Sequence, residues 1–268
     1  MSALLILAAT TLLQYSTECV DNRLRGADPS AALSRFSFYP AGANFGKFVS
    51  NDRFWAKGMD FSCASPWNDR GGSLRAGTLI SKRHIIYARH FPIAAGARIL
   101  FVGSDGEVCP CYLEKSKRVE RTDIMIGLLN AEVTPNIQPA KILPTDYERY
   151  IGNGSGFPIV TFNQREQLSL TEANALPTNS AAYLMTCHVP MDERRSLFRV
   201  KIDVGDSGNP AFLLVGDKPI LLYCIMHGVC GSGKAIHTYR EEIQSVMDEL
   251  CPGYKLECFD FSEVGYGK

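Results

Sequence analysis

Short runs of β-branched and aromatic residues, separated by glycine, proline, asparagine and aspartate, recur along this chain from residue 77 onward. Such runs are typical of β-strands, and the residues between them are typical of tight turns. The predicted strands cover residues 78–80, 84–87, 98–102, 124–129, 157–162, 182–186, 197–200, 211–215 and 220–226. This pattern favours a sandwich or barrel over alternating β-α-β units, so we predict an all-β fold.

One helix is predicted near the C-terminus, where four apolar residues recur at helical spacing: Ile243, Val246, Met247 and Leu250. Thr238 and Glu241 form a capping-box pattern before this segment, and Pro252 with Gly253 ends it. Residues 216–219 are predicted to form the loop of a hairpin.

The length of 268 residues suits one large all-β domain or two small barrels that share a core. A polar stretch at residues 130–150 marks a boundary. We expect an N-terminal barrel with an extension over residues 20–135, a C-terminal barrel over 136–238, and a helix and tail over 239–268.

Composition narrows the function classes. Lys plus Arg and Asp plus Glu number 28 each, and no basic run stands out, which disfavours nucleic-acid binding. Apolar residues make up 46% of the chain, so disorder is not expected. Cys109 and Cys111 form a C-x-C pair, which is weak for zinc without further His or Cys partners. We expect no metal and no cofactor.

Residues 4–13 form an apolar segment that is too short to span a bilayer but fits a secretory signal over residues 1–19. We therefore expect no stable membrane span and a secreted or periplasmic protein, the alternative being a buried N-terminal strand or helix. Loss of Cys19 with the signal would leave eight of nine cysteines, a number compatible with disulfides. Cys224 with Cys230, and Cys251 with Cys258, are close enough in sequence to pair.

Three segments carry candidate chemistry. Gly205 and Gly208 bracket Asp206 and Ser207, so the backbone can turn tightly and expose the Gly205 and Ser207 amides to a developing oxyanion. A serine nucleophile also needs an adjacent base. The segment 77–90 reads GTLISKRHIIYARH, two strands with a tight turn followed by His90. The third segment, TDIMIGLL at residues 122–129, places Asp123 before an apolar strand.

These segments, in the order His90, Asp123, Ser207, resemble the trypsin/chymotrypsin-like serine peptidase family, as a divergent, bacterial-type member. The resemblance covers roughly residues 77–250, with loose matching between the motifs. It implies two antiparallel Greek-key β-barrels with a C-terminal helix. It also implies that His90 is the general base and acid, Asp123 its orienting partner and Ser207 the nucleophile that becomes acylated by a protein or peptide substrate.

The chain departs from the family at several positions. Arg75 and Phe91 stand where many members have a pair of cysteines, and Asn209 replaces a second glycine. No Ile-Val-Gly-Gly activation sequence is present. In animal trypsins a new N-terminus pairs with the Asp before the nucleophile. Here Asp206 needs another partner, or activation proceeds differently. The oligomeric state is left open.

The specificity pocket is the part of the site for which the sequence gives the weakest signal. Counting back from Ser207, Lys201 resembles the residue at the pocket floor, and Met226, His227 and Gly228 resemble the wall segment that pairs with substrate. Lys201 with His227 would favour an acidic side chain at the cleavage point. The alternative is that an insertion shifts the register and leaves Lys201 in an exposed loop.

Two other functions stay open. A catalytically silent or latent homologue would serve as a binding module, although the presence of all three triad residues speaks against it. A viral or intracellular processing protease of the same fold would use the apolar N-terminal segment as part of its structure.

Overall fold

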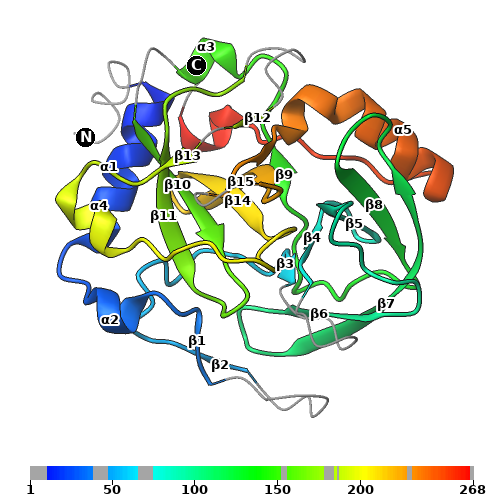
Figure 1. Ribbon diagram of the computed structural model, residues 1–268, viewed down its shortest axis with the longest axis horizontal. Helices are drawn as coiled ribbons and strands as arrows, with labels where there is room; N and C mark the ends of the chain where they lie inside the picture. The colour runs from blue at the N-terminus through cyan, green and yellow to red at the C-terminus, as the bar shows by residue number, and fades with distance from the viewer. Residues whose placement is uncertain are drawn as a thin grey trace.

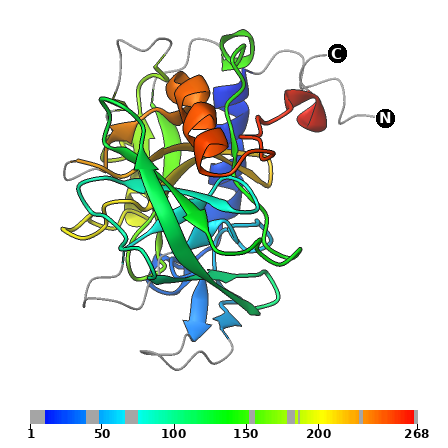
Figure 2. The ribbon, with the colours of Figure 1, turned by 90° about the vertical axis from the view of Figure 1, so that its right-hand side faces the viewer.

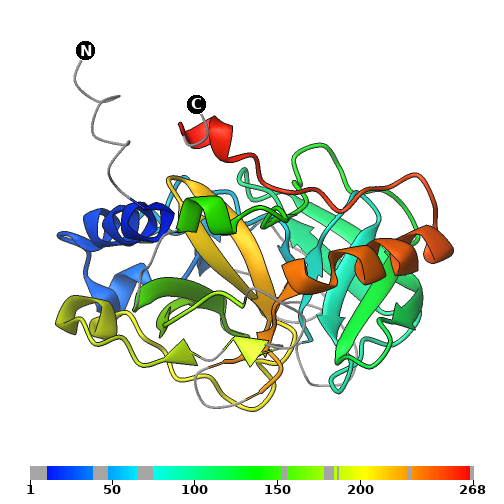
Figure 3. The ribbon, with the colours of Figure 1, turned by 90° about the horizontal axis from the view of Figure 1, so that it is seen from above.

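The computed structural model describes residues 11–38, 48–65, 75–151, 156–177, 184–185, 187–227 and 231–265. These residues form mostly β-sheet with few helices, as the strand pattern predicts. Two six-stranded sheets lie next to each other along the long axis of the molecule (Figures 1 and 3). Helix α1 lies beside one sheet and helix α5 beside the other.

The first sheet is antiparallel throughout and nearly closes into a barrel, because its outer strands β3 and β6 contact each other. In spatial order its strands are β3 (Ala64–Ser65), β4 (Gly77–Leu79), β5 (His84–Ala88), β8 (Ile124–Leu129), β7 (Val108–Arg118) and β6 (Arg98–Val102). Every residue of β5 is buried, which explains why its sequence is a continuous apolar run rather than an alternating one.

The second sheet is antiparallel except for its last strand, β9, which runs parallel to β15. In spatial order its strands are β13 (Cys187–His188), β11 (Leu168–Ala173), β10 (Phe157–Phe162), β14 (Pro210–Val215), β15 (Lys218–Cys224) and β9 (Lys141–Ile142). The predicted hairpin joins β14 to β15, with Val215 opposite Lys218 and Gly216 at a φ of +66°. Two small sheets pair β1 (Phe36–Phe38) with β2 (Val49–Ser50), and β12 (Leu184–Met185) with β16 (Gly233–Lys234).

Aromatic side chains join the two sheets into one core. Phe61, which precedes β3, has its ring centroid 5.2 Å from that of Phe162 and 5.6 Å from that of Phe212. All three rings are almost fully buried. Residues of both sheets therefore belong to one buried hydrophobic cluster.

Helix α1 (Leu12–Leu24) begins at a capping box formed by Thr11 and Gln14. Its apolar side packs against β10 and β14, and Leu12, Leu13 and Val20 are buried there. The end of the apolar N-terminal segment is thus part of a packed helix, which matches the alternative of a buried N-terminal element. In the parts of the chain that the structure describes, no helix has the length and apolar character needed to cross a membrane.

Helix α5 (Arg240–Leu250) confirms the C-terminal helix, with its four predicted apolar residues buried against the first sheet. It follows the second sheet in sequence and reaches across to β7 and β8 (Figure 2). The predicted capping box is wrong. The 3-10 turn η1 (Ile236–Tyr239) precedes the helix, and the Thr238 hydroxyl donates instead to the Ala235 carbonyl, 2.8 Å away.

The strand predicted at residues 197–200 is also wrong, because helix α4 (Glu193–Leu197) covers its first residue and no strand follows. Asp192 caps this helix by accepting from the Arg195 N–H at 2.9 Å. The remaining helices are short: α2 (Pro29–Ala32), α3 (Glu148–Ile151) and η2 (Phe261–Val264).

The eight described cysteines are all free thiols, so no disulfide is seen among them, and Cys251 and Cys258, which are close enough in sequence to pair, do not do so. Cys251 ends α5, where its sulfur accepts a hydrogen bond from Arg83 at 3.8 Å. Cys258 belongs to another segment, which forms a bridge to Ile142. The two thiols therefore have different surroundings. Cys230 lies outside the described residues.

Candidate active site

Strand pairing brings His90 and Asp123 together. Ala88 at the end of β5 lies opposite Ile124 at the start of β8, so the residues just beyond these two positions are neighbours. The Arg89 N–H donates to the Asp123 carbonyl at 2.8 Å, which extends the pairing by one step. His90 therefore leaves the barrel beside Asp123, although 33 positions separate them in sequence.

The three predicted triad residues form a continuous hydrogen-bonded chain. Asp123 Oδ2 is 2.5 Å from His90 Nδ1, and Asp123 Oδ1 accepts from the His90 main-chain N–H at 3.0 Å. His90 Nε2 is 2.9 Å from Ser207 Oγ. A carboxylate beside Nδ1 favours the tautomer with its proton on Nδ1, which leaves Nε2 free to accept the serine proton. The His90 side chain is 41% exposed, so a substrate can reach it.

Ser207 reaches His90 because its loop packs closely against the first sheet. Gly208 has a φ of +90°, and a Cβ atom at this position would lie 2.8 Å from the Ala76 carbonyl oxygen. The Gly208 N–H donates to the Ile225 carbonyl at 2.8 Å. Only glycine combines this backbone conformation with so close an approach. Asn209 does not have a positive φ, so its replacement of a second glycine costs no backbone strain.

The two predicted oxyanion donors are the main-chain amides of Gly205 and Ser207. Gly205 has a φ of +103°. Among the described residues, no acceptor is found for the N–H of Gly205 or of Ser207. Two unpaired donors beside a serine hydroxyl suit stabilisation of a developing negative oxygen.

The Asp206 carboxylate is satisfied by backbone amides. Its side chain is buried, with 4% of the residue exposed. Oδ1 accepts from the Gln164 N–H at 2.9 Å, and Oδ2 accepts from the Asp203 N–H at 2.8 Å. Burial raises the pKa of this carboxyl, and the two N–H donors oppose that rise. Gln164 has no signal of its own in the sequence, because it is a polar residue in a hairpin turn.

The residues predicted to line the specificity pocket differ in their exposure to solvent. Lys201 is exposed, and its Nζ is 3.2 Å from Asp203 Oδ1, the arrangement expected of a loop residue. Met226 is buried with 3% of its surface exposed, whereas His227 is exposed. The His227 ring stacks on His90, with centroids 6.0 Å apart and planes 13° apart. Gly228 lies outside the described residues.

His84, the other histidine of the segment 77–90, is a buried structural residue. Its Nδ1 lies 2.8 Å from the Ser81 hydroxyl, and its ring packs edge-on against Tyr254. Burial lowers the pKa of His84 to about 4, so this ring is neutral near pH 7. It does not contact the three hydrogen-bonded residues.

Arg75 and Phe91, which replace a cysteine pair of the resembled family, contact each other. The Arg75 guanidinium lies 4.9 Å from the Phe91 ring centroid, within the range of a cation–π contact. Phe91 follows His90 directly and packs against the core. A non-covalent contact therefore stands where the disulfide is absent.

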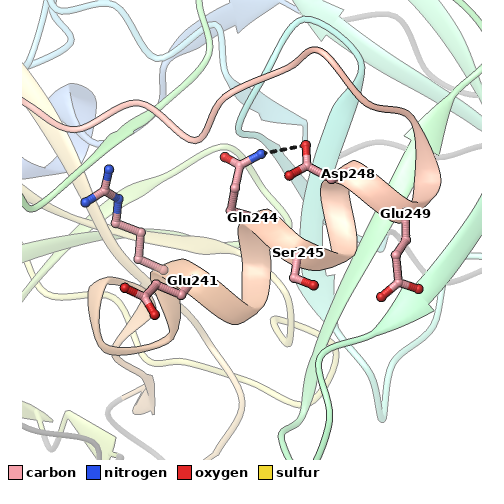
Figure 4. Close-up of a pocket in the computed structure, with 6 residues that line it drawn as sticks. Glu241, Gln244, Ser245, Asp248 and Glu249 are labelled. Atoms are coloured by element: carbon pink, nitrogen blue, oxygen red, sulfur yellow. Dashed lines mark hydrogen bonds between the residues drawn. The ribbon is translucent and has the colours of Figure 1, made fainter.

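The exposed side of α5 carries a shallow depression lined by Arg240, Glu241, Gln244, Ser245, Asp248 and Glu249. Gln244 donates to Asp248 at 3.0 Å there (Figure 4).

A hydrogen bond from Cys111 lowers the pKa of Cys109 to about 5. Within the described residues, no group of His, Cys, Asp and Glu has the arrangement of a metal site.

No protein-family model matches this chain, and no curated protein matches it significantly.

Proposed function

We propose that this protein is a serine endopeptidase of the trypsin/chymotrypsin type, a divergent, bacterial-type member with two Greek-key barrels. The supporting observation is the chain of hydrogen bonds from Asp123 through His90 to Ser207. His90 and Ser207 are 117 positions apart in sequence, so it is the fold that places the serine hydroxyl beside the carboxylate-bound imidazole. The exposed side chain of His90 and the unpaired main-chain N–H groups of Gly205 and Ser207 also support the proposal.

Acylation follows from this arrangement. Ser207 Oγ attacks the scissile carbonyl carbon while His90 Nε2 takes the hydroxyl proton. The resulting imidazolium is stabilised by the Asp123 carboxylate, which stays ionised. The carbonyl oxygen becomes an oxyanion and accepts from the Gly205 and Ser207 N–H groups. His90 then passes its proton to the leaving amine, and the peptide bond breaks.

Deacylation repeats these steps with water. His90 Nε2 takes a proton from a water molecule, whose oxygen attacks the acyl carbon on Ser207. The second tetrahedral intermediate collapses, the proton returns to Ser207 Oγ, and the carboxylic acid product leaves. Every proton is carried by His90, so the proposed reaction requires no metal or cofactor.

The proposed substrate is a protein or peptide, with an acidic side chain at the cleavage point. His227 supports this preference because it is exposed and lies against His90. Lys201 does not support it, since its exposed ammonium pairs with Asp203, as the alternative of an exposed loop residue predicts.

Secretion or export to a periplasm remains part of the proposal. Packing of residues 12 and 13 in α1 is more in line with the alternative in which the N-terminal segment is structural. Fusion of residues 1–21 to a reporter tests this point. An exported reporter supports secretion, and a retained one favours a processing protease inside the cell.

Labelling with a fluorophosphonate probe tests the activity directly. The wild-type protein is expected to react at Ser207, and Ser207→Ala and His90→Ala are expected to abolish labelling. Ser245→Ala and His188→Ala are matched controls, because both side chains are exposed elsewhere on the surface. A folded wild-type protein that stays unlabelled would favour a silent or latent homologue acting as a binding module.

A further inference from the structure

We propose that Gln164 is a positioning residue that holds residues 203–208, here called the oxyanion loop, in their active arrangement without a newly cut N-terminus. This inference rests on the proposed function. Gln164 lies in the turn between β10 and β11 and takes no part in the proton transfers described above. It contacts the oxyanion loop at two places, one through its main chain and one through its side chain.

The main-chain contact is the hydrogen bond to Asp206. A buried carboxylate without donors is costly, and here the Gln164 and Asp203 N–H groups supply one donor to each oxygen. The Asp206 carbonyl also accepts from the Asn209 N–H at 3.1 Å and from Asn209 Nδ2 at 3.0 Å. Both the side chain and the main chain of Asp206 are therefore held from within the folded protein, where animal trypsins use an N-terminal ammonium.

The side-chain contact is with Gly205. A Cβ atom built on Gly205 would lie 2.1 Å from Gln164 Nε2, so the amide occupies the space that any side chain at residue 205 would need. Gly205 provides one of the two proposed oxyanion donors. An amide packed against its Cα restricts how far this peptide can rotate, and so favours the orientation in which the Gly205 N–H is unpaired.

The turn that carries Gln164 is itself rigidly held. Asn163 Oδ1 accepts from the Arg165 N–H at 2.9 Å and the Gln167 N–H at 3.1 Å. The N-terminal segment ties the turn to the body, because the Arg35 N–H donates to the Glu166 carbonyl at 2.9 Å. These hydrogen bonds define the position from which Gln164 contacts the oxyanion loop.

The first test uses the full 268-residue chain with Met1 retained, verified by mass spectrometry. The inference expects equal rates of fluorophosphonate labelling before and after limited proteolysis near the N-terminus. Labelling that needs prior cleavage would overturn the inference and leave the proposed peptidase standing. No labelling under either condition would overturn both.

The second test separates positioning from folding. Gln164→Ala keeps the N–H donor to Asp206 but removes the contact with Gly205. We expect the inactivation rate constant kinact to fall by on the order of 10- to 100-fold, the cost of misplacing a reacting group by about 1 Å, with KI for the probe unchanged. Gln164→Met, which refills the space above Gly205, is expected to recover most of the rate.

Gln138→Ala is the matched control, because that side chain is bonded to the Pro135 carbonyl at the exposed surface. A Gln164→Ala protein that labels at the wild-type rate contradicts the inference. So does a loss of rate that is fully explained by a smaller folded fraction, measured by circular dichroism on the same samples. Failure of Gln164→Met to improve on Gln164→Ala would also count against the packing role.

Discussion

Asp123 accepts two hydrogen bonds from His90, one from the ring at 2.5 Å and one from the main-chain N–H at 3.0 Å. The two oxygens of one carboxylate thus hold both the ring and the backbone of the proposed base. This arrangement fixes the position of the imidazole as well as its tautomer, which leads to the first prediction.

Asp123→Asn is expected to lower the acylation rate by about 10⁴-fold, because an amide NH₂ beside Nδ1 favours the wrong tautomer of His90. The main-chain bond to the side-chain oxygen can persist, so folding should be preserved. Stopped-flow labelling with a fluorophosphonate and thermal unfolding measure the two properties. A variant that stays folded and keeps the wild-type rate would contradict the assignment of Asp123.

His227 is predicted to select substrates. A peptide library should reveal a preference for Asp or Glu before the cleaved bond, and His227→Ala should reduce it about 10- to 100-fold, the value of a hydrogen bond to a charged group. Lys201→Ala is the comparison, with a smaller effect expected because that ammonium is exposed and paired. A library profile that shows no preference for Asp or Glu before the cleaved bond would contradict this prediction.

Removal of residues 1–19 is predicted to lower the free energy of unfolding of the protein. It removes Leu12 and Leu13, which are 0% and 3% exposed, and burial of each leucine contributes about 1.5–3 kcal/mol. A chain that begins at Thr11 keeps the helix and its capping box, and serves as the control. Urea unfolding compares the two. Equal unfolding free energies would show that α1 adds nothing to the stability of the body.

Glu166 is predicted to make stability depend on pH. Burial raises the pKa of its carboxyl from 4.5 to about 7, and the positive charge of Arg35, at 3.9 Å, only partly opposes this. The folded protein therefore binds this proton more tightly than the unfolded chain does. Its contribution to stability is fully present below pH 4.5 and is lost as the pH rises through 7.

Glu166→Gln should remove that contribution. Relative to the wild type, the variant is expected to gain on the order of 3 kcal/mol between pH 4.5 and pH 8, read from the difference between the two unfolding curves. Glu263→Gln, at an exposed carboxylate, is the control. Parallel curves for wild type and Glu166→Gln would disprove a raised pKa at this position.

Local patterns in the sequence were sufficient for much of the fold. Runs such as those at residues 84–87 and 124–129 became β5 and β8, because a buried strand needs only a short apolar run between turn residues. The strand expected at residues 197–200 did not form. Asp192 caps a helix that includes Leu197, and the three residues after this helix belong to no strand.

The features of the site also divide into those that the local sequence predicts and those that depend on the fold. The sequence by itself determined which residues are candidates. Gly205, Ser207 and Gly208 form a pattern typical of a tight turn, and His90 and Asp123 each adjoin an apolar strand. Only the tertiary structure decided that Asp206 is held by Gln164, that His227 stacks on His90 and that α1 packs on the second sheet. These contacts join residues that are far apart in sequence, and their energies depend on burial and direction, which a one-dimensional pattern does not contain.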